Sequence, residues 1–313
     1  MNEKPLLWLR NGHINTIYTS QYRKVRHLPF TRERITTPDA DFLDLDWTSC
    51  NSNKLVILSH GLEGSSRRPY IQGMVNKFHH AGFDTLAWNY RGCSDELNKT
   101  KLYYHSGSTY DLNSVIACAL SKNKYDSIYL IGFSMGGNIT LKFLGEQSAS
   151  VNPIIKKAMA ISTPIFLRDC SDQLKVGFSK IYARNFLKTL KQKVVAKKHL
   201  LPEINLKKVL NAQDLEQFDN LITAPLHGFA DADDYYTKCS SKQNLTSITI
   251  PTLILSALDD PFLKNNCYPY EECKANPKLI LSTPTHGGHN GFCINPKKNH
   301  YWSEYLAEKF ILS

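Results

Sequence analysis

One ten-residue stretch, IYLIGFSMGG at positions 128–137, constrains the fold more than any other part of the chain. A run of apolar and β-branched residues leads into the segment GFSMG at 132–136, and residues 138–146 follow with the apolar spacing of a helix. A serine placed between a strand and a helix, with glycines two positions before and after it, is typical of a nucleophile elbow. A Cβ at either glycine would clash in so tight a turn. The pattern therefore predicts that Ser134 is a nucleophile, and the alternative is a serine in a glycine-rich turn at an anion site.

Strand-like and helix-like segments alternate around this elbow. Continuous apolar runs predict buried parallel strands, and apolar residues at helical spacing predict the helices between them. The strands are expected at 54–59, 83–90, 128–133, 157–162, 250–257 and 278–282, and the helices at 69–80, 109–120, 138–146 and 301–310. Residues 33–47 alternate around a turn and predict an antiparallel hairpin at the edge of the sheet. We therefore expect an α/β fold, with a mostly parallel central sheet covered by helices on both faces.

The alternation stops in residues 165–236, which carry helical patterns and no convincing strand. The aromatic and aliphatic residues at 178, 182, 186, 190 and 194 recur at i, i+4 spacing. We expect residues 1–313 to form one domain, with 165–236 inserted as a helical cap over the active site. The alternative is a pair of extra surface helices with solvated lysines.

The charge of the chain is concentrated in one part of this insertion. The formal net charge is +10, and residues 175–208 alone contain ten lysines or arginines and one acidic residue, which gives that segment +9. A charge confined to one segment favours a local basic face, which predicts peripheral contact with an anionic membrane or an acidic substrate. No mixture of basic and aromatic residues resembles a nucleic-acid-binding module, so we expect no nucleic-acid partner.

A serine nucleophile needs a base, a carboxylate that orients the base, and N–H donors for the oxyanion. The loop after the last strand contains His289 between two glycines, and His286 is the alternative base. Asp259 and Asp260 both follow the strand at 250–257, and two adjacent carboxylates cannot both point at one imidazole. We choose Asp260 because it begins the sequence D-P-F, and Asp259 remains the alternative acid. The chain order Ser, Asp, His is that of an α/β-hydrolase.

The oxyanion donors should be the backbone N–H of Met135, directly after the nucleophile, and that of Leu62, in the turn after the strand at 54–59. His60, at the start of that turn, is expected to be a structural hydrogen-bonding group. The H-x-x-H spacing of His286 and His289 could also serve zinc, but no third ligand has a suitable spacing. The prediction is therefore an enzyme without metal or cofactor.

Three further observations concern the environment of the protein. No run approaches 18 apolar residues, and the apolar start at Leu6–Leu9 is too short for a signal-peptide core. The eight cysteines are scattered without a C-x-x-C, which favours free and mostly buried thiols. We expect a cytoplasmic protein.

Several stretches together resemble the YheT-like branch of the α/β-hydrolase superfamily, which comprises relatives of bacterial carboxylesterases and of eukaryotic acylglycerol and phospholipid lipases. They are Asn11-Gly12-His13 with Thr16, HGLEGSSRRPY at 60–70, NYRGCS at 89–94, YYHSGSTYDL at 103–112, GFSMGGN at 132–138, HGFADADDYY at 227–236, PTLILSALDDPF at 251–262 and HGGHNGF at 286–292. The resemblance spans about residues 11–292. It implies a triad of Ser134, Asp260 and His289, and it departs from the usual pattern at Leu258, where the family has Asn or Ala.

The sequence thus predicts a serine hydrolase that cleaves carboxylic esters, with short or lipid-like acyl groups, through an acyl-enzyme. A thioesterase, an amidase or an acyltransferase would use the same residues. The alternative from another class is a non-catalytic relative that binds a lipid or a metabolite, although a binder has no need of all three catalytic groups.

Overall fold

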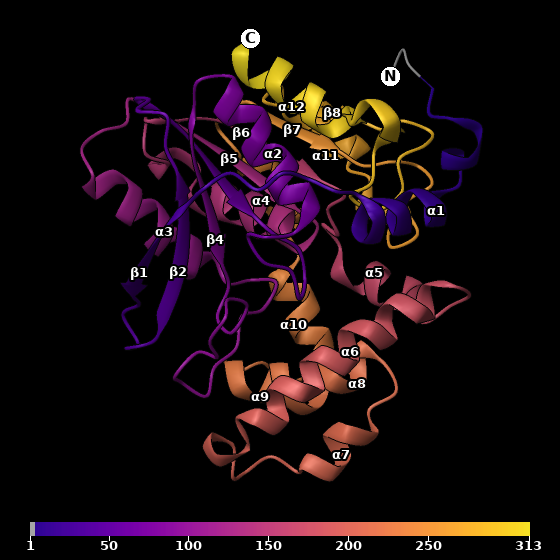
Figure 1. Ribbon diagram of the computed structural model, residues 1–313. Helices are drawn as coiled ribbons and strands as arrows, with labels where there is room; N and C mark the ends of the chain where they lie inside the picture. The colour runs from indigo at the N-terminus through magenta and orange to yellow at the C-terminus, as the bar shows by residue number, and fades with distance from the viewer. Residues whose placement is uncertain (1–3) are drawn as a thin grey trace.

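The computed structural model describes residues 4–313 and contains one large sheet with helices on both sides (Figure 1). Its strands run in the order β1-β2-β4-β3-β5-β6-β7-β8, and β9 pairs with β10 in a separate small ribbon. The strands are β1 (Thr31–Thr36), β2 (Phe42–Thr48), β3 (Lys54–Ser59), β4 (Asp84–Asn89), β5 (Ser127–Phe133), β6 (Ile155–Ile161), β7 (Thr252–Leu255), β8 (Leu279–Ser282), β9 (Cys293–Asn295) and β10 (His300–Tyr301).

The pairing of the large sheet confirms the expected α/β architecture. The strands from β4 to β8 pair in parallel, while β1 and β2 form an antiparallel hairpin whose inner strand β2 pairs antiparallel with β4. The hairpin lies at the edge of the sheet, as its alternating pattern predicts. The ribbon of β9 and β10 was not predicted, because each of its strands has at most three residues.

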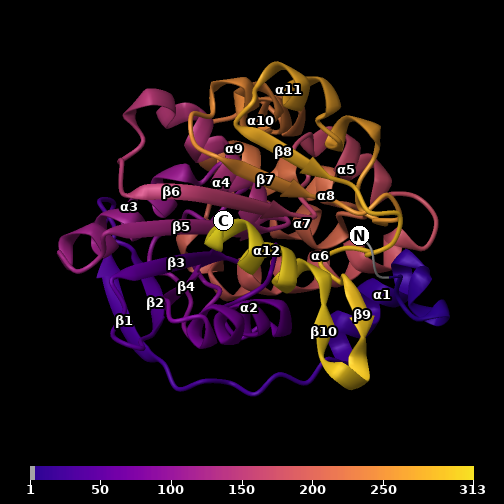
Figure 2. The same ribbon diagram turned by 90° about the horizontal axis from the view of Figure 1, so that it is seen from above.

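The helices that cover the sheet belong to two layers, and strand β3 shows why. Leu55 and Ile57 on β3 pack in one apolar cluster with α3 and α4, while Val56 and Leu58 pack in a second cluster with α2 and α12. Successive side chains of a strand point to opposite faces, so a strand buried on both faces must be apolar throughout. Figure 2 shows α12 lying over the sheet. These helices are α2 (Pro69–His80), α3 (Thr109–Ser121), α4 (Met135–Gln147) and α12 (Trp302–Leu312).

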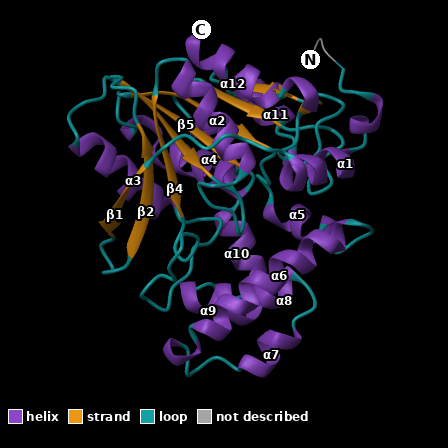
Figure 3. Cartoon of the chain, viewed as in Figure 1, coloured by secondary structure: helices purple, strands orange, loops and turns teal. Residues whose placement is uncertain are grey.

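The segment between β6 and β7 contains helices and loops, and its helices α6 to α9 lie apart from the sheet (Figure 3). We call residues 165–247 the helical insertion. It comprises α5 (Leu167–Gln173), α6 (Ser179–Ala196), α7 (Leu206–Asn211), α8 (Leu215–Phe218), the π-helix η5 (Asp219–Thr223), α9 (Ala224–His227), α10 (Ala232–Cys239) and the 3₁₀ helix η6 (Lys242–Ser247). Its members α6, α7 and η5 share a small apolar core of their own, which is centred on Leu187, Val194, Val209 and Ile222.

Further short helices lie outside these groups. The short helix α1 (Gly12–Ile17) continues into a π-helical turn, η2 (Tyr18–Tyr22), and α11 (Tyr270–Ala275) precedes β8. The side chain of His13 on α1 packs against Phe178 and Tyr182 at the start of α6, and its Nδ1 lies 3.1 Å from the Tyr182 hydroxyl. The N-terminal segment thus contacts the helical insertion.

Candidate active site

Ser134 occupies the turn between β5 and α4 in a strained backbone conformation. Its φ is +53°, which residues with a side chain rarely adopt. A Cβ at Gly132 would collide with the carbonyl of Gly136, and a Cβ at Gly136 would collide with the backbone of Ser59 and lie 2.5 Å from the carbonyl oxygen of His60. Both glycines are therefore required by backbone contacts, as the elbow pattern predicts. The helix begins at Met135, three residues earlier than the apolar spacing suggested.

Three side chains from separate loops meet at this turn. The His289 Nε2 lies 2.8 Å from the Ser134 hydroxyl oxygen, and its Nδ1 lies 2.9 and 3.0 Å from the two carboxylate oxygens of Asp260. All three residues are buried. A carboxylate can only accept, so Nδ1 carries the proton and Nε2 is left to accept from the serine hydroxyl. The structure therefore brings together the three residues that the sequence singled out.

Phe262 supports this arrangement from the same loop as Asp260. Its ring stacks on the His289 imidazole with centroids 3.9 Å apart and planes 14° from parallel, and its backbone N–H donates to Asp260 Oδ1 at 2.9 Å. The ring covers one face of the imidazole and limits its rotation. The D-P-F sequence therefore supplies both the carboxylate and the aromatic cover.

The competing residues, Asp259 and His286, lie together on the outer side of the same loops. Asp259 Oδ1 accepts hydrogen bonds from the backbone N–H groups of Gly287 and Gly288 at 2.9 and 2.8 Å, and its Oδ2 lies 3.5 Å from Nδ1 of His286. Burial raises the pKa of Asp259. No hydrogen bond joins His286 to Ser134 in residues 4–313. Asp259 therefore holds the loop that carries His289, and Asp260 orients its imidazole.

The N-terminal segment also contacts the loop that carries His289, and the sequence alone did not predict this contact. The Thr16 hydroxyl accepts from the His289 backbone N–H at 2.8 Å and donates to the Gly12 carbonyl at 2.7 Å. The Asn15 side chain donates to the carbonyls of Leu9 and Cys293 and accepts from the N–H of Cys293. The only signal in the sequence was that the segment Asn11–Thr16 carried part of the family resemblance.

The predicted oxyanion donors flank Ser134. Leu62 and Met135 line the same cavity as Ser134, and neither backbone N–H has an acceptor among the described residues. The loop before Leu62 approaches so closely that a Cβ on Gly61 would lie 3.1 Å from the Ser134 Cβ. These two amides are thus free to donate to a bound ligand.

Both ring nitrogens of His60 form hydrogen bonds that fix the loop that carries Leu62. Its Nδ1 donates to the Gly61 carbonyl at 2.7 Å, and its Nε2 accepts from the N–H of Tyr90 at 3.3 Å. Complete burial lowers the pKa of His60 to about 3, so the imidazole is neutral at physiological pH. The Tyr70 hydroxyl also accepts from the Gly61 N–H at 3.0 Å.

Two cavities open from Ser134. The first, which we call the insertion cavity, spans about 1030 Å³ of empty space and is walled largely by apolar side chains of the helical insertion. The second, the N-terminal cavity, spans about 990 Å³ and lies between the N-terminal segment, the Leu62 loop and α6. Leu62, Ser134, Phe186 and Phe262 line both, so a ligand that reaches into both cavities must pass the serine.

An ion pair joins the helical insertion to the loop beside Ser134. The Lys193 ammonium on α6 lies 2.6 Å from a carboxylate oxygen of Glu63, which also accepts from the Tyr104 hydroxyl at 2.6 Å. Lys193 lines the insertion cavity and Glu63 lines the N-terminal cavity. The pair therefore spans the boundary between the two cavities.

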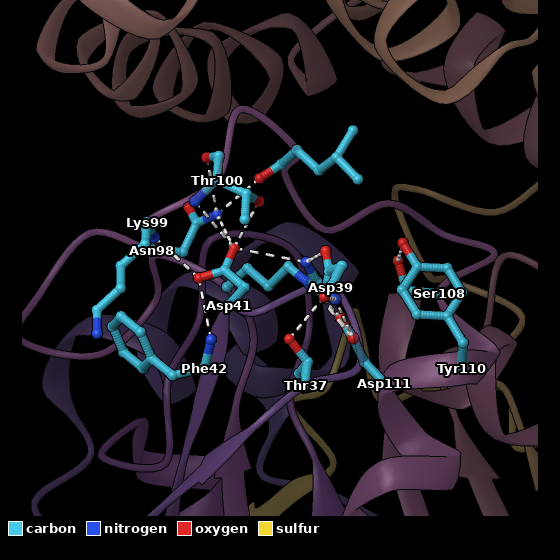
Figure 4. A network of polar contacts seen from close by, with 12 residues as sticks. Thr37, Asp39, Asp41, Phe42, Asn98, Lys99, Thr100, Ser108, Tyr110 and Asp111 are labelled. Carbon is cyan, nitrogen blue, oxygen red and sulfur yellow. Dashed lines mark hydrogen bonds and ion pairs between the residues drawn. The ribbon is translucent and has the colours of Figure 1, made fainter.

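Figure 4 shows a polar network around Asp39, Asp41 and Asp111. Through Asn98, which donates to the Leu102 carbonyl, it holds the loop whose Tyr103 and Tyr104 line the insertion cavity. The Arg91 guanidinium forms ion pairs with Asp111 and Asp39, and Asp41 accepts from the side chains of Asn98 and Thr100. The Lys197 ammonium of the insertion donates to Asn98 Oδ1 at 2.9 Å. The motifs around Arg91 and Asp111 thus have a structural role.

Residues 4–313 contain no group of three or more His, Cys, Asp or Glu side chains that could hold a metal ion. None of their helices is long and apolar enough to cross a bilayer. All eight cysteines are free, and four of them are buried while Cys50 is exposed.

Comparison with known proteins agrees with this fold. The sequence model described as the alpha/beta hydrolase fold matches residues 54–296. The chain is 34% identical to the Escherichia coli protein YheT over 92% of this chain and 86% of that protein, and 28% identical to human Phospholipase ABHD3 over 97% and 77%. Among solved structures, the esterase Pf2001 of Pyrococcus furiosus superposes with a TM-score of 0.60 at 19% identity, covering 92% of this chain and 97% of that one.

Proposed function

Because the chain belongs to the α/β-hydrolase family, we propose that it is a serine hydrolase that cleaves carboxylic esters through Ser134, His289 and Asp260. The observation that carries this proposal is the continuous hydrogen-bonded path from Asp260 through the imidazole to the serine hydroxyl, with distances of 2.9 and 2.8 Å. A relative named as a phospholipase, human ABHD3, supports an ester substrate.

In the proposed reaction, Ser134 Oγ attacks the ester carbonyl while His289 Nε2 takes the hydroxyl proton. Asp260 keeps the imidazole in the required tautomer and stabilises the imidazolium that forms. The imidazolium then gives its proton to the departing alcohol oxygen, which leaves an acyl-serine. Water, activated by the same imidazole, releases the acyl group as a carboxylic acid and restores the serine.

The backbone N–H groups of Met135 and Leu62 would bind the negative charge that develops on the carbonyl oxygen. Removal of one such donor from an oxyanion hole typically costs 10²- to 10³-fold in kcat. Both amides lack an acceptor within residues 4–313, which supports this role.

We propose that residues 165–236 act as a cap over the active site. Seven leucine, isoleucine or phenylalanine side chains of the insertion line the insertion cavity: Leu167, Leu174, Phe186, Leu190, Leu215, Phe218 and Ile222. Apolar walls of this kind suit an acyl chain. A thioester or an acyl acceptor other than water would use the same machinery, and a substrate panel separates these cases.

A fluorophosphonate probe tests the nucleophile directly. We expect the probe to label the wild-type protein and to leave Ser134→Ala unlabelled, and hydrolysis of short p-nitrophenyl esters should disappear in the same variant. Equal labelling of both proteins would reject the assignment, and labelling without hydrolysis of any ester or thioester would favour a binding protein.

We further propose that one face of the insertion contacts anionic membranes. Six basic side chains of residues 175–208 are exposed and form no ion pair with any described residue: Lys180, Arg184, Lys188, Lys198, Lys207 and Lys208. The first three follow i, i+4 spacing on α6, beside exposed Phe178 and Ile181. The whole segment does not act as one face, because Lys175 and Lys193 form ion pairs inside the protein and Lys197 is buried.

The membrane contact is tested by binding to vesicles with and without anionic lipid. Each basic residue near an anionic surface contributes about 1 kcal/mol, so the triple variant Lys180→Gln, Arg184→Gln, Lys188→Gln should bind acidic vesicles more than tenfold more weakly. Binding by the wild type should also fall as salt rises. Indifference to lipid charge and to salt would contradict the contact while leaving the proposed hydrolysis intact.

A further inference from the structure

The first turn of α6 is hydrogen-bonded to the loop that carries Asp260. The Ser179 hydroxyl donates to the Pro261 carbonyl at 2.8 Å, and Ser179 is only 3% exposed. Pro261 directly follows the carboxylate residue and precedes the aromatic residue that covers the imidazole. Building on the proposed function, we propose that Ser179 and Tyr182 of the helical insertion are positioning residues, which set the orientation of the His289 imidazole through this loop.

The Phe262 ring contacts aromatic rings of α6 as well as the imidazole. Its centroid lies 4.9 Å from that of Tyr182 and 6.1 Å from that of Phe186, while it stacks on His289 at 3.9 Å. Phe262 is buried. Side chains in a close-packed interior cannot shift independently of their neighbours. Loss of the Tyr182 ring would therefore free the Phe262 ring, and with it the imidazole that this ring covers.

Tyr182 is in turn held by the N-terminal helix α1. Its hydroxyl lies 3.1 Å from Nδ1 of His13, and the two rings stack with centroids 5.9 Å apart and planes 10° from parallel. The same helix carries Thr16, which accepts from the backbone N–H of His289. Helix α1 thus contacts the backbone of the histidine directly and its ring through the aromatic side chains.

The far end of α6 is joined to the loop that carries Leu62. Lys193 forms its ion pair with Glu63, the residue after Leu62. Ser179 and Lys193 are separated by about 21 Å along the helix at 1.5 Å per residue. One helix of the insertion therefore connects the loop of Asp260 with the loop that supplies a proposed oxyanion donor. A shift of α6 would change both sides of the site.

The alternative role for Tyr182 is that of a wall residue, because its side chain also lines the N-terminal cavity. A wall residue acts on the binding of substrates that fill the cavity, so its loss changes KM and depends on the substrate. A positioning residue acts on the alignment of the imidazole, and a displacement of about 1 Å can cost about 10²-fold in rate. Its loss should therefore slow every reaction of Ser134, including the reaction with a small reagent.

Phenylmethylsulfonyl fluoride provides this test, because it is too small to fill either cavity. Ser134 Oγ attacks its sulfur, fluoride leaves, and His289 takes the hydroxyl proton, so the rate of inactivation depends on the same imidazole. Tyr182→Ala should lower the second-order rate constant of inactivation by about tenfold or more. It should lower kcat on a p-nitrophenyl ester by a similar factor and change KM less. Tyr182→Phe keeps the ring against Phe262 and should recover most of both losses.

Ser179→Ala tests the same loop by an independent contact. It leaves the Pro261 carbonyl without this donor and should lower both rates by about three- to tenfold. Asn185→Ala is the matched control, since Asn185 lies one turn beyond Tyr182 on α6, is exposed and lines the same cavity. It should be inactivated at the wild-type rate. Thermal unfolding of each variant shows that the rates belong to folded protein, and Ser179→Ala decides if Tyr182→Ala does not fold.

Wild-type rates of inactivation in Tyr182→Ala and Ser179→Ala would overturn this inference and leave ester hydrolysis standing. Equal losses in Tyr182→Ala and Tyr182→Phe, or in Tyr182→Ala and Asn185→Ala, would also overturn it, because the ring would then not be the route to the imidazole. If the reagent does not modify the wild type, and the wild type hydrolyses no p-nitrophenyl ester, the proposed function fails instead.

Discussion

The hydroxyl group of Thr16 accepts a hydrogen bond at 2.8 Å from the backbone N–H of His289, a residue 273 positions further along the chain. The same hydroxyl donates to the Gly12 carbonyl, and a Cβ on Gly288 would collide with that carbonyl oxygen and with Thr16. The N-terminal segment and the histidine loop therefore pack so closely that their backbones are in contact. Thr16 is a positioning residue, because it acts on the imidazole through the backbone.

Thr16→Val should lower kcat by about tenfold, because the His289 N–H loses its acceptor and the loop gains freedom. Thr16→Ser keeps the hydroxyl and should recover most of the loss. The measurement is steady-state kinetics on a p-nitrophenyl ester, with thermal unfolding to separate a local from a global effect. A fall in kcat that serine does not rescue would argue against this hydrogen bond.

Substitutions of the two adjacent carboxylates should lower kcat by very different factors. Asp260→Asn keeps the shape of the side chain but allows the wrong imidazole tautomer, so kcat should fall by about 10⁴-fold. Asp259→Asn keeps an oxygen that can accept from the N–H groups of Gly287 and Gly288, so its kcat should fall by less than about tenfold. The comparison of kcat in the two variants checks this, and the reverse ranking would move the acid to Asp259.

The elbow glycines should tolerate no side chain. Gly136→Ala forces a Cβ against the backbone of Ser59 and His60, so it should destabilise the protein by more than about 3 kcal/mol or prevent folding. Gly82→Ala is the matched control, since its φ is +80° but nothing lies within 4 Å of the added Cβ. It should cost about 1 kcal/mol. Urea unfolding measures both, and similar losses would refute the steric argument.

The ion pair between Lys193 and Glu63 should contribute more to stability than a surface pair does, because both side chains are largely buried. Lys193→Met leaves the Glu63 carboxylate without its cation and should destabilise the fold by about 3 kcal/mol. The double variant Glu63→Gln, Lys193→Met removes the stranded charge and should recover part of that loss. A double-mutant cycle in urea measures the coupling, and additive losses would show that the two side chains are independent.

Stability should depend on pH through Asp219, which lines the insertion cavity. Burial raises the pKa of Asp219 to about 6, although the hydroxyls of Thr223 and Tyr236 donate to it. The carboxyl of the unfolded chain has a pKa of about 3.9, so between about pH 4 and 6 the folded state binds more protons. The free energy of unfolding therefore falls as pH rises through that window, by about 2–3 kcal/mol from this group.

Asp219→Asn removes the titrating group and keeps its shape, so the variant should gain stability over the wild type as pH rises from about 4 to 6. Urea unfolding at a series of pH values measures the difference. If the free energies of unfolding of the two proteins differ by the same amount at every pH in that window, the raised pKa is contradicted.

Features that depend on residues close together in the chain could be predicted from the sequence. Gly132 marks the elbow in the sequence because a Cβ there would collide with Gly136, only four residues away. The apolar runs predict the parallel strands because alternate side chains of one strand face the two helical layers. The chain order Ser134, Asp260, His289 could likewise be recognised without coordinates.

The roles of adjacent residues that point in different directions could not be predicted in this way, because they depend on how distant segments pack. Asp259 and Asp260 are adjacent and chemically identical, yet one holds the backbone of the histidine loop and the other the imidazole. The basic residues of 175–208 form one run in the sequence, but Lys197 is buried and Lys188 is exposed. The contact between Thr16 and His289 depends on the packing of distant segments, which local pattern does not encode.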